Sequence, residues 1–384
     1  MRVAVVHDWL YTIGGAERVL REILRCYPSA DVFALFDFLT AAERARLGIT
    51  QVRTSFLQKM PFVQNHHRLF LPLMPIAIEQ FDLSSYDLVI SSSYAVAKGI
   101  LTSPDQVHVA YIHSPIRYAW DMQHSYLRES GYSRGLKSIL ARIVLHRIRM
   151  WDARTAHGPD EIIANSAFIA KRIQKIYGRR AHVIYPPVTL SERSGLTRRN
   201  GHFLAASRLV PYKNIEAVVR AFGLLPDLEL VVAGDGPQAH RLRKIASPNV
   251  SFVGYVPDAE LRDLMASARA FVFAAEEDFG IIPVEALSEG TPVLALARGG
   301  VRETVTTATG RRTGMFFVNA APDEIAACVR SFVAQESAFS ADDCRTQASR
   351  FSARRFREEF KAFVDSAVTK QGANREITIS RKSA

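Results

Sequence analysis

Short apolar segments alternate with longer amphipathic segments along this chain, and this alternation limits the possible folds more than any other feature. A helix-like spacing of apolar residues is clear at 16–24, directly after the first apolar segment. Apolar segments of strand length lie at 2–7, 31–36, 87–90, 107–112, 161–164 and 182–185. Strands without regular polar alternation are typical of a parallel sheet covered on both faces. The pattern therefore predicts a doubly wound α/β fold.

The alternation stops at 186–201 and then starts again. This segment holds two prolines followed by mostly polar residues, a composition typical of an interdomain linker. Further strands are expected at 202–206, 228–233, 250–253, 270–273 and 292–295. A chain of 384 residues is also long for a single hydrophobic core. We therefore expect two Rossmann-like domains that face each other across a cleft.

The domain boundaries follow from the same pattern. The first domain is expected at 1–188 and the second at 200–345. A last amphipathic helix at 352–366 is expected to pack back on the first domain. The polar and charged segment 369–384 is expected to form a flexible tail.

Composition narrows the class of protein. No apolar run approaches the roughly 18 residues of a membrane-spanning helix. The first residues are typical of a core strand, not of a signal peptide, so a cytoplasmic location is expected. The three cysteines (Cys26, Cys328 and Cys344) are far apart, which predicts neither a disulfide framework nor a zinc site. The net charge of +11 favours polyanionic partners, but no nucleic-acid-binding motif occurs.

Two segments that follow predicted strands have the character of anion sites. Gly14 and Gly15 connect the first strand to the first helix, where a backbone can approach a phosphate closely, although a simple tight turn explains them equally well. The second segment runs from Glu277 to Glu285. Gly280 allows a turn, Pro283 suits a helix start, and the amides of Ile281 and Ile282 would point at an anion.

Other groups follow the neighbouring strands of the second domain. Arg208 and Lys213 come after the strand at 202–206, where they could neutralise a diphosphate. Gly234 opens the segment Gly-Asp-Gly-Pro after the next strand. Because the carboxyl ends of parallel strands meet at one edge of a sheet, ligands bind there, and we expect these groups to lie together.

In this order, the segments resemble the retaining glycosyltransferases of family 4, which have the architecture called GT-B. The resemblance covers about residues 3–363 and is strongest in the second half. It is carried by the pattern Glu-x7-Glu together with Ser-Arg-Leu, Gly-Asp-Gly-Pro and, in the first half, Asn165-Ser166, all in the expected order. Two residues depart from the family pattern: Asp278 stands where Gly is usual, and Arg302 stands where Pro is usual. The resemblance implies a hexosyltransferase that retains the configuration of the transferred sugar.

The resemblance also implies roles for individual residues. Arg208 and Lys213 would bind the donor diphosphate, Glu285 the ribose and Glu277 the donor sugar, together with the backbone around Phe279 and Gly280. Gly15 would approach the phosphate from the first domain. The predicted catalytic residues are His113, Glu277, Arg208 and Lys213. The predicted donor-binding residues are Gly14, Gly15, Gly234, Phe279, Gly280, Ile281, Ile282 and Glu285.

Three further segments lie in the first domain. His113 ends the strand at 107–112 and is expected to hydrogen-bond near the sugar. Asn165-Ser166 either shapes the site or caps the following helix. Arg117, Tyr118 and Trp120 are candidates for acceptor binding, although packing explains Trp120 as well.

The segment 133–154 predicts a basic amphipathic helix, with six Lys or Arg residues and one acid, Asp152. Its apolar face packs into the domain core, or the helix lies on an anionic membrane. The two interpretations are compatible if the apolar face points inward and the basic face points toward lipid.

The donor and acceptor are implied by resemblance alone. The segments around Tyr111 to Pro115 and Arg117 to Asp121 are similar to bacterial polysaccharide mannosyltransferases, so GDP-mannose and a polyprenyl-diphosphate-linked saccharide are expected. UDP-sugars remain an alternative donor. A nucleotide-sugar epimerase, a hydrolase and a non-catalytic binder are alternative functions. No Asp-x-Asp motif or His/Asp cluster at metal-ligand spacing occurs, so no metal cofactor is expected.

Overall fold

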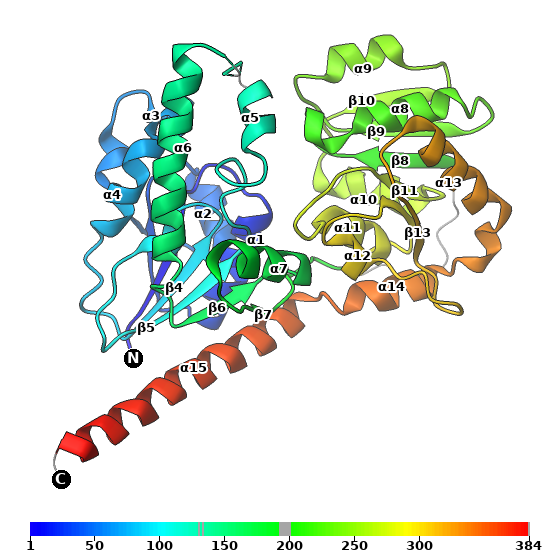
Figure 1. Cartoon of the computed structure of the whole chain (residues 1–384). Coiled ribbons are helices and arrows are strands. Elements are labelled where there is room, and N and C mark those ends of the chain that lie inside the picture. Colours follow the sequence, from blue (N-terminus) through cyan, green and yellow to red (C-terminus); the bar gives the residue numbers. More distant parts are fainter. Residues whose placement is uncertain (130, 133, 192–200, 383–384) are drawn as a thin grey trace. The chain divides into compact units, whose positions relative to one another are not determined.

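The computed structural model describes residues 1–129, 131–132, 134–191 and 201–382 (Figure 1). The chain divides into two compact units. The N-terminal unit comprises Met1–Pro187 and Arg354–Ala384, and the C-terminal unit comprises Val188–Ala353. Most of the expected linker, residues 192–200, lies outside the described residues.

The described residues of the N-terminal unit form a parallel sheet of seven strands in the order β3-β2-β1-β4-β5-β6-β7. The strand order runs outward in both directions from the β1/β4 pair, which makes this pair the topological switch point of the sheet. The strands are β1 (Val3–His7), β2 (Asp31–Ala34), β3 (Val52–Thr54), β4 (Leu88–Ser93), β5 (Val107–Ile112), β6 (Glu161–Ala164) and β7 (His182–Val183).

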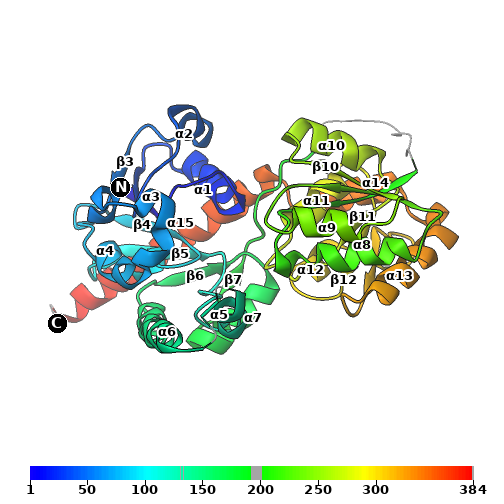
Figure 2. The same cartoon turned by 90° about the horizontal axis from the view of Figure 1, so that it is seen from above.

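Helices cover both faces of this sheet, as Figure 2 shows. They are α1 (Gly15–Cys26), α2 (Ala41–Leu47), η1 (Phe56–Lys59), α3 (Val63–His66), η2 (His67–Leu73), α4 (Met74–Glu79), η3 (Ala97–Gly99), α5 (Gln123–Glu129), α6 (Leu136–Thr155), α7 (Ala167–Tyr177) and α15 (Ala353–Lys382). Val3 and Val5 of β1 pack with α1 and α15, whereas Ala4 and Val6 pack with α4 and η3. Burial of alternate residues on both faces explains why β1 is apolar throughout.

The last helix, α15, completes the core of the N-terminal unit. Phe356, Phe360 and Val364 are buried in the same cluster as α1 and β1. The helix continues to Lys382, across residues where we expected a flexible tail. Part of this extension is anchored, because the side-chain amide of Gln371 donates to the backbone oxygen of Gln106 at 3.2 Å.

Helix α6 corrects one prediction. Its inward face carries Leu145, Ile148 and Asp152, which are buried. The apolar residues expected in the core at the start of the helix instead point outward: Leu136, Ile139, Leu140 and Ile143 are exposed. The expectation that the apolar face points inward is therefore wrong for the first half of α6. Among the described residues, no helix is long and apolar enough to cross a membrane.

The described part of the C-terminal unit contains a second parallel sheet, with the six strands in the order β10-β9-β8-β11-β12-β13. Its switch point lies between β8 and β11. The strands are β8 (His202–Ala206), β9 (Glu229–Ala233), β10 (Val250–Gly254), β11 (Phe271–Phe273), β12 (Val293–Leu296) and β13 (Gly314–Phe317). The sequence pattern did not predict β13. The prediction of a doubly wound α/β fold is confirmed in both units.

The helices of the C-terminal unit also lie on both faces of their sheet (Figure 2). They are η4 (Pro211–Lys213), α8 (Ile215–Gly223), α9 (Ala239–Ile245), α10 (Asp258–Ser267), α11 (Ile281–Ser288), α12 (Val301–Thr304), α13 (Pro322–Ala334), η5 (Glu336–Ala338) and α14 (Ala341–Ser349). Phe203 of β8, Phe222 of α8 and Phe332 of α13 lie in the main core cluster of this unit.

Candidate active site

Two predicted residues form an ion pair at the switch point of the C-terminal unit. Lys213 lies in η4, which follows β8, and Glu277 follows the neighbouring strand β11. The Lys213 ammonium contacts the Glu277 carboxylate, and both side chains are largely but not fully buried, at 14% and 20% exposure. Open α/β sheets bind ligands at this position, so the pair lies where chemistry is expected.

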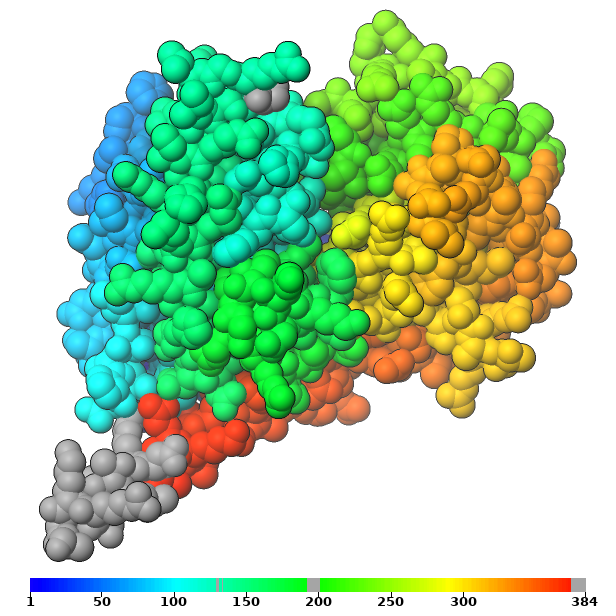
Figure 3. Space-filling model, in the orientation of Figure 1, coloured from blue at the N-terminus to red at the C-terminus, as the bar shows by residue number. Residues whose placement is uncertain are grey.

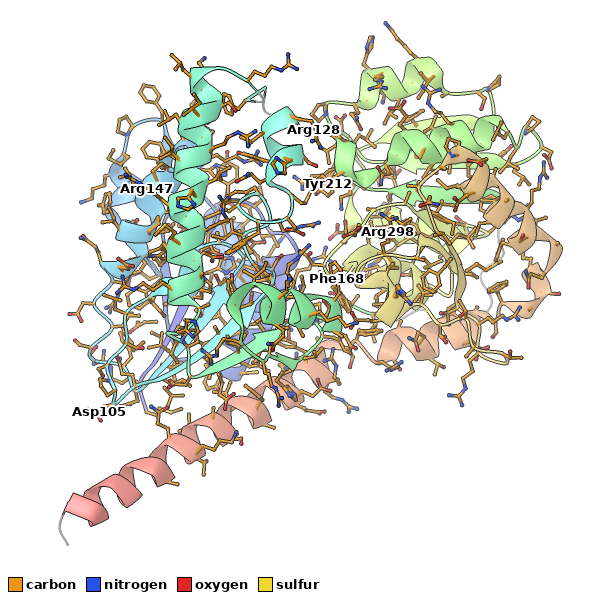
Figure 4. The ribbon with its side chains drawn as sticks, viewed as in Figure 1. Asp105, Arg128, Arg147, Phe168, Tyr212 and Arg298 are labelled. Carbon is orange, nitrogen blue, oxygen red and sulfur yellow. The ribbon has the colours of Figure 1, made fainter. Side chains whose placement is uncertain are left out.

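Tyr212 contacts both predicted cations, Arg208 and Lys213. The Arg208 guanidinium donates to the Tyr212 hydroxyl at 2.9 Å, and the Lys213 ammonium lies 5.1 Å from the centre of the Tyr212 ring. Tyr212, which Figure 4 labels, was not among the predicted residues. Its position directly before Lys213 was a possible signal, because a cation can rest on the face of an aromatic ring.

Helix α11 begins immediately after Gly280, whose positive φ of 85° suits glycine. Ile281 and Ile282 are therefore the first two helical residues, and their amides have no intrahelical acceptor. The predicted start at Pro283 is two residues late. As a result, Glu285 is the fifth residue of the helix and not a member of its first turn. The amides of this first turn favour an anion.

The loop that carries Glu277 rests on two glycines after β12. The Gly300 amide donates to the Glu277 carbonyl at 2.9 Å. A Cβ on Gly299 would lie 2.3 Å from that same carbonyl oxygen, and a Cβ on Gly300 would lie 2.5 Å from the Phe279 Cα. Side chains at either position would displace the loop. The two glycines stand shortly before Arg302, but they were not among the predicted site residues.

Gly234 and Phe279 have packing roles in the structure. Gly234 has a φ of 122°, and a Cβ there would lie 1.9 Å from the Ser207 carbonyl oxygen, so the loop after β9 is packed against the segment that carries Arg208. The Phe279 ring is buried, with its centre 5.4 Å from that of Phe351. The ring of Phe279 thus anchors the loop to the core.

In the N-terminal unit, a chain of hydrogen bonds crosses the β1/β4 switch point. The Ser92 hydroxyl lies 2.9 Å from His113 Nε2 and 3.1 Å from His7 Nδ1. His7 Nε2 lies 3.4 Å from a Glu17 carboxylate oxygen. Burial, with a smaller contribution from His7, lowers the pKa of His113 to about 3. His113 is therefore a neutral hydrogen-bonding group at neutral pH, with His7 and Ser92 fully buried behind it.

The glycines at the start of α1 differ from those of the C-terminal unit. Gly14 has an ordinary φ of −117°, and its amide donates to Glu17 Oε2 at 2.8 Å. A carboxylate of the chain thus already occupies part of this helix start. Gly15 is the first residue of the helix and is exposed.

The proposed acceptor residues pack against α6. The Trp120 indole N–H donates at 2.7 Å to Asp152, which is fully buried and also binds the Lys98 ammonium at 2.6 Å. Tyr118 packs beside Trp120 against the same small core cluster, and burial raises its pKa. These contacts give Trp120 the packing role that the sequence left open. Arg117 is half-buried next to Tyr118.

Asn165-Ser166 was expected either to shape the site or to cap the following helix, and the structure shows the cap for the serine. Ser166 is the residue before α7, and its hydroxyl accepts a hydrogen bond from the Ile169 amide at 3.1 Å. This contact is a helix cap. Both residues are buried.

Comparison with protein families identifies both halves of the chain. The model described as "Glycosyltransferase Family 4" matches residues 13–192, and the model described as "Glycosyl transferases group 1" matches residues 190–351. Together the two models cover residues 13–351.

Among characterised relatives, a GDP-mannose-dependent monoacylated alpha-(1-6)-phosphatidylinositol monomannoside mannosyltransferase from Corynebacterium glutamicum is 31% identical over 147 residues, 33% of this chain and 39% of the relative. A GDP-mannose-dependent alpha-(1-6)-phosphatidylinositol monomannoside mannosyltransferase from Mycobacterium tuberculosis is 29% identical over 224 residues, 50% of this chain and 55% of the relative. The chain thus spans only about half or less of the length of these relatives.

Solved structures share the fold of the whole chain. Anabaena HepE in complex with UDP superposes with a TM-score of 0.70 at 20% identity, over 95% of this chain and 100% of HepE. Sucrose-phosphate synthase from Thermosynechococcus elongatus gives a TM-score of 0.69 at 16% identity, over 96% of this chain and 100% of the synthase. The chain belongs to the family 4 glycosyltransferases and has their GT-B architecture of two Rossmann-like domains.

Proposed function

We propose that the chain transfers a sugar from a nucleoside-diphosphate donor, with retention of configuration, and that the C-terminal unit binds the donor. The observation that carries this proposal is the Lys213–Glu277 pair at the β8/β11 switch point. Lys213 and Arg208 would hold the diphosphate, and Glu277 would hold hydroxyls of the sugar. Glu285 would bind the ribose from the same helix whose first amides face an anion.

The chemistry of the leaving group supports this assignment. Cleavage of the bond between sugar and phosphate leaves negative charge on the diphosphate. Arg208, Lys213 and the first amides of α11 place positive charge and hydrogen-bond donors at one edge of the sheet, which stabilises such charge. We propose that these groups make a metal cofactor unnecessary. Chelator-resistant transfer is expected, and loss of transfer in EDTA that added Mg²⁺ restores would contradict it.

We also propose that the acceptor attacks on the same face of the sugar that the diphosphate leaves, with the leaving phosphate taking the acceptor's proton. This path needs no nucleophilic carboxylate. The two carboxylates at the end of β1 and the start of α1 are engaged by the chain itself: Asp8 accepts four backbone N–H groups from residues 94–97, and Glu17 accepts the Gly14 amide. A trapped glycosyl-enzyme adduct would contradict this path.

We propose GDP-mannose as the donor, because the names of the two mannosyltransferase relatives describe them as GDP-mannose-dependent. A UDP-sugar is the second candidate. It is supported by the HepE structures, which contain UDP or UDP-glucose. The fold alone is compatible with either base.

A thermal-shift panel of GDP, UDP, ADP and their sugars tests the donor proposal. A ligand that binds the folded state raises the melting temperature by an amount that grows with its affinity and concentration. Stabilisation by GDP and GDP-mannose, lost in Glu285→Ala, is expected. Stabilisation by the uridine nucleotides would transfer the proposal to a UDP-sugar, and no stabilisation by any nucleotide at millimolar concentration would overturn it. Rapid turnover of the donor without acceptor would instead indicate an epimerase or hydrolase.

For the acceptor, we propose a polyprenyl-diphosphate-linked saccharide of polysaccharide assembly, reached from an anionic membrane surface. The first half of α6 supports this proposal. Leu136 and Leu140, 85% and 63% exposed, lie on the same outward face as Ile139, Ile143 and Met150, which are also exposed. Figure 3 shows this blue-green helix at the surface of the N-terminal unit.

The charges along α6 favour anionic lipid. Lys137, Arg142, Arg147 and Arg154 are exposed, and the helix carries no exposed acid along its 20 described residues. Figure 4 labels Arg147 on this helix. Exposed apolar side chains flanked by cations are typical of helices that lie in the interface of an anionic bilayer. The names of the two mannosyltransferase relatives also contain an anionic lipid, phosphatidylinositol.

Vesicle sedimentation tests the membrane proposal. Binding to vesicles with 30% anionic lipid, weakened by salt and absent with zwitterionic vesicles, is expected on the basis of about 1 kcal/mol for each cation near the surface. The double variant Leu140→Glu/Ile143→Glu is expected to abolish it. Leu224→Glu, at an exposed leucine of the C-terminal unit, is the matched control. Equal binding by the double variant and the control, or concentration-dependent dimers without vesicle binding, would overturn the proposal.

A further inference from the structure

The hydrogen-bonded chain that ends at His113 begins at the first turn of α1 and links four side chains: Glu17, His7, Ser92 and His113. They come from α1, from the ends of β1 and β4, and from the residue after β5. His7 and Ser92 are completely buried, whereas His113 keeps 9% of its surface. Both ends of the chain keep a little exposed surface, since Glu17 is 7% exposed, and at the His113 end Nε2 is already bonded to Ser92.

The direction of each hydrogen bond follows from the groups at the other end. A Glu17 carboxylate only accepts hydrogen bonds, so the His7 nitrogen that faces it, Nε2, must carry hydrogen. The separation of 3.4 Å between His7 Nε2 and Glu17 Oε1 exceeds the roughly 2.7–2.9 Å typical of a hydrogen bond between an imidazolium and a carboxylate, and a buried imidazolium is costly. His7 is therefore assigned as the neutral ring with a lone pair on Nδ1.

The Ser92 hydroxyl transmits this direction to His113. A hydroxyl has one hydrogen, and the Nδ1 lone pair of His7 takes it. The Ser92 oxygen must then accept, and the group that donates to it is the Nε2–H of His113, 2.9 Å away. With its proton on Nε2, the His113 ring has a lone pair on Nδ1. A sugar hydroxyl could donate a hydrogen bond to that nitrogen.

We propose that Glu17, His7 and Ser92 are positioning residues that set the tautomer of His113, so that its Nδ1 accepts a hydrogen bond from a sugar hydroxyl. This inference rests on the proposed role of His113 at the sugar. It gives Glu17 a task beyond capping α1. Reversal of any one hydrogen bond in the chain would turn Nδ1 of His113 into a donor.

Glu17→Gln tests the proposal, because the surrounding atoms dictate how the amide must lie. The Gly14 amide donates to Glu17 Oε2 at 2.8 Å, so the glutamine oxygen stays there and its NH2 group faces His7 Nε2. His7 must then carry its proton on Nδ1 and donate to Ser92, and Ser92 must donate to His113 Nε2. The expected tautomer of His113 in this variant is therefore the opposite one.

The tautomer is read from the ring ¹⁵N chemical shifts of protein labelled at its 11 histidines, with the His113→Gln spectrum used for assignment. In the unaltered chain, Nε2 of His113 is expected at a protonated shift and Nδ1 at an unprotonated shift, and Glu17→Gln exchanges the two. Transfer is expected to fall about tenfold in kcat/KM, the effect of one neutral hydrogen bond.

Glu43→Gln is the matched control. Glu43 accepts the Thr40 amide at 2.8 Å at the start of α2, the same helix-cap contact, but it is only half-buried, and its side chain has no histidine partner among the described residues. This variant should change neither the His113 shifts nor transfer.

Ser92→Ala interrupts the chain and provides the second test. In the double variant Glu17→Gln/Ser92→Ala, the His113 shifts should equal those of Ser92→Ala alone, because the change at residue 17 no longer reaches His113. An unchanged His113 tautomer in folded Glu17→Gln, or a proton on Nδ1 in the unaltered chain, would overturn the inference. The spectra need no turnover. If the unaltered chain showed no transfer but Glu17→Gln still exchanged the His113 tautomer, the proposed function would be overturned and the positioning chain would stand.

Discussion

The two switch points of this molecule have the same topology but opposite chemistry. At β8/β11 of the C-terminal unit, Arg208 is exposed and Lys213 is paired with Glu277 in a partly accessible position. At β1/β4 of the N-terminal unit, His7 and Ser92 are fully buried in a hydrogen-bonded chain that runs from the Glu17 carboxylate to His113. The same edge of the same kind of sheet therefore carries a partly accessible ion pair in one unit and, in the other, a buried chain of neutral side chains that ends on one carboxylate.

Under the proposed function, this difference divides the work between the two units. A diphosphate leaving group needs positive charge that is held in place and is still reachable, and the C-terminal unit has it. A sugar hydroxyl needs one acceptor in a fixed direction, and a buried chain of neutral groups holds it more rigidly than an exposed side chain. The shared strand order says where each site lies, and the residues after the strands decide what it does.

Removal of the charge from the C-terminal switch point should have the largest effect. Lys213→Ala is expected to lower kcat/KM about 100- to 1,000-fold, the size found when one preorganised group that stabilises developing charge is removed. Steady-state transfer assays measure it. Lys244→Ala, at an exposed lysine of α9 in the same unit, should leave the rate unchanged. A tenfold or smaller loss in Lys213→Ala would mean that charge at this switch point does not dominate.

The glycines of the two switch points should also respond differently. Gly234→Ala places a Cβ 1.9 Å from the Ser207 carbonyl oxygen at a φ of 122°, so a loss of about 3 kcal/mol in unfolding free energy is expected. Gly15→Ala, in the first turn of α1, should change stability by less than about 1 kcal/mol, because its backbone needs no positive φ. Circular dichroism during urea unfolding measures both. Equal losses would remove this distinction between the units.

The buried histidines predict a smaller effect that depends on pH. Burial lowers the pKa of both His108 and His113 to about 3, far below the usual 6.5. Their contribution to stability is therefore fully present above pH 6.5 and is lost as the pH falls toward 3, because the unfolded chain binds the protons. His108→Gln should reduce the loss between pH 7 and pH 5 by up to about 2 kcal/mol.

Tryptophan fluorescence measures this loss in one unit alone, because Trp9, Trp120 and Trp151 all belong to the N-terminal unit. Urea titrations at pH 7 and pH 5 give the two free energies. His146→Gln, at an exposed histidine of α6, is the control and should leave the pH dependence as it was. The same pH dependence in His108→Gln and in the unaltered chain would show that burial of His108 does not control it.

Much of the fold could be predicted from the sequence because each strand is a local apolar run. The expected strand at 87–90 nevertheless stops too early, since Ser91, Ser92 and Ser93 continue β4 as buried residues. Polar side chains end a hydrophobic pattern, whereas in the structure two of these serines bond to histidines: Ser91 to His108 and Ser92 to both His7 and His113. Their burial depends on partners that lie far away in the sequence.

The candidate site likewise contains residues that could be predicted from the sequence and residues that could not. Arg208, Lys213 and Glu277 could be proposed because charged residues directly after predicted strands collect at one sheet edge. Glu17 could not, since its contact with His7 depends on how α1 lies against β1. The sequence also did not predict that Leu136 and Leu140 are exposed. Amphipathic spacing shows that a helix has two different faces, but it does not show which of them packs against the core.

The position of α15 in the chain has a consequence for folding during translation. The C-terminal unit is one continuous stretch, Val188–Ala353, and can fold as soon as that stretch has emerged. Most of the N-terminal unit is synthesised before that stretch, yet Phe356, Phe360 and Val364 of its core are synthesised after it. The N-terminal unit is therefore expected to be completed after the C-terminal unit, although most of it is synthesised before. A stop codon after Ala353 would leave the C-terminal unit whole and would remove part of the interior of the N-terminal unit.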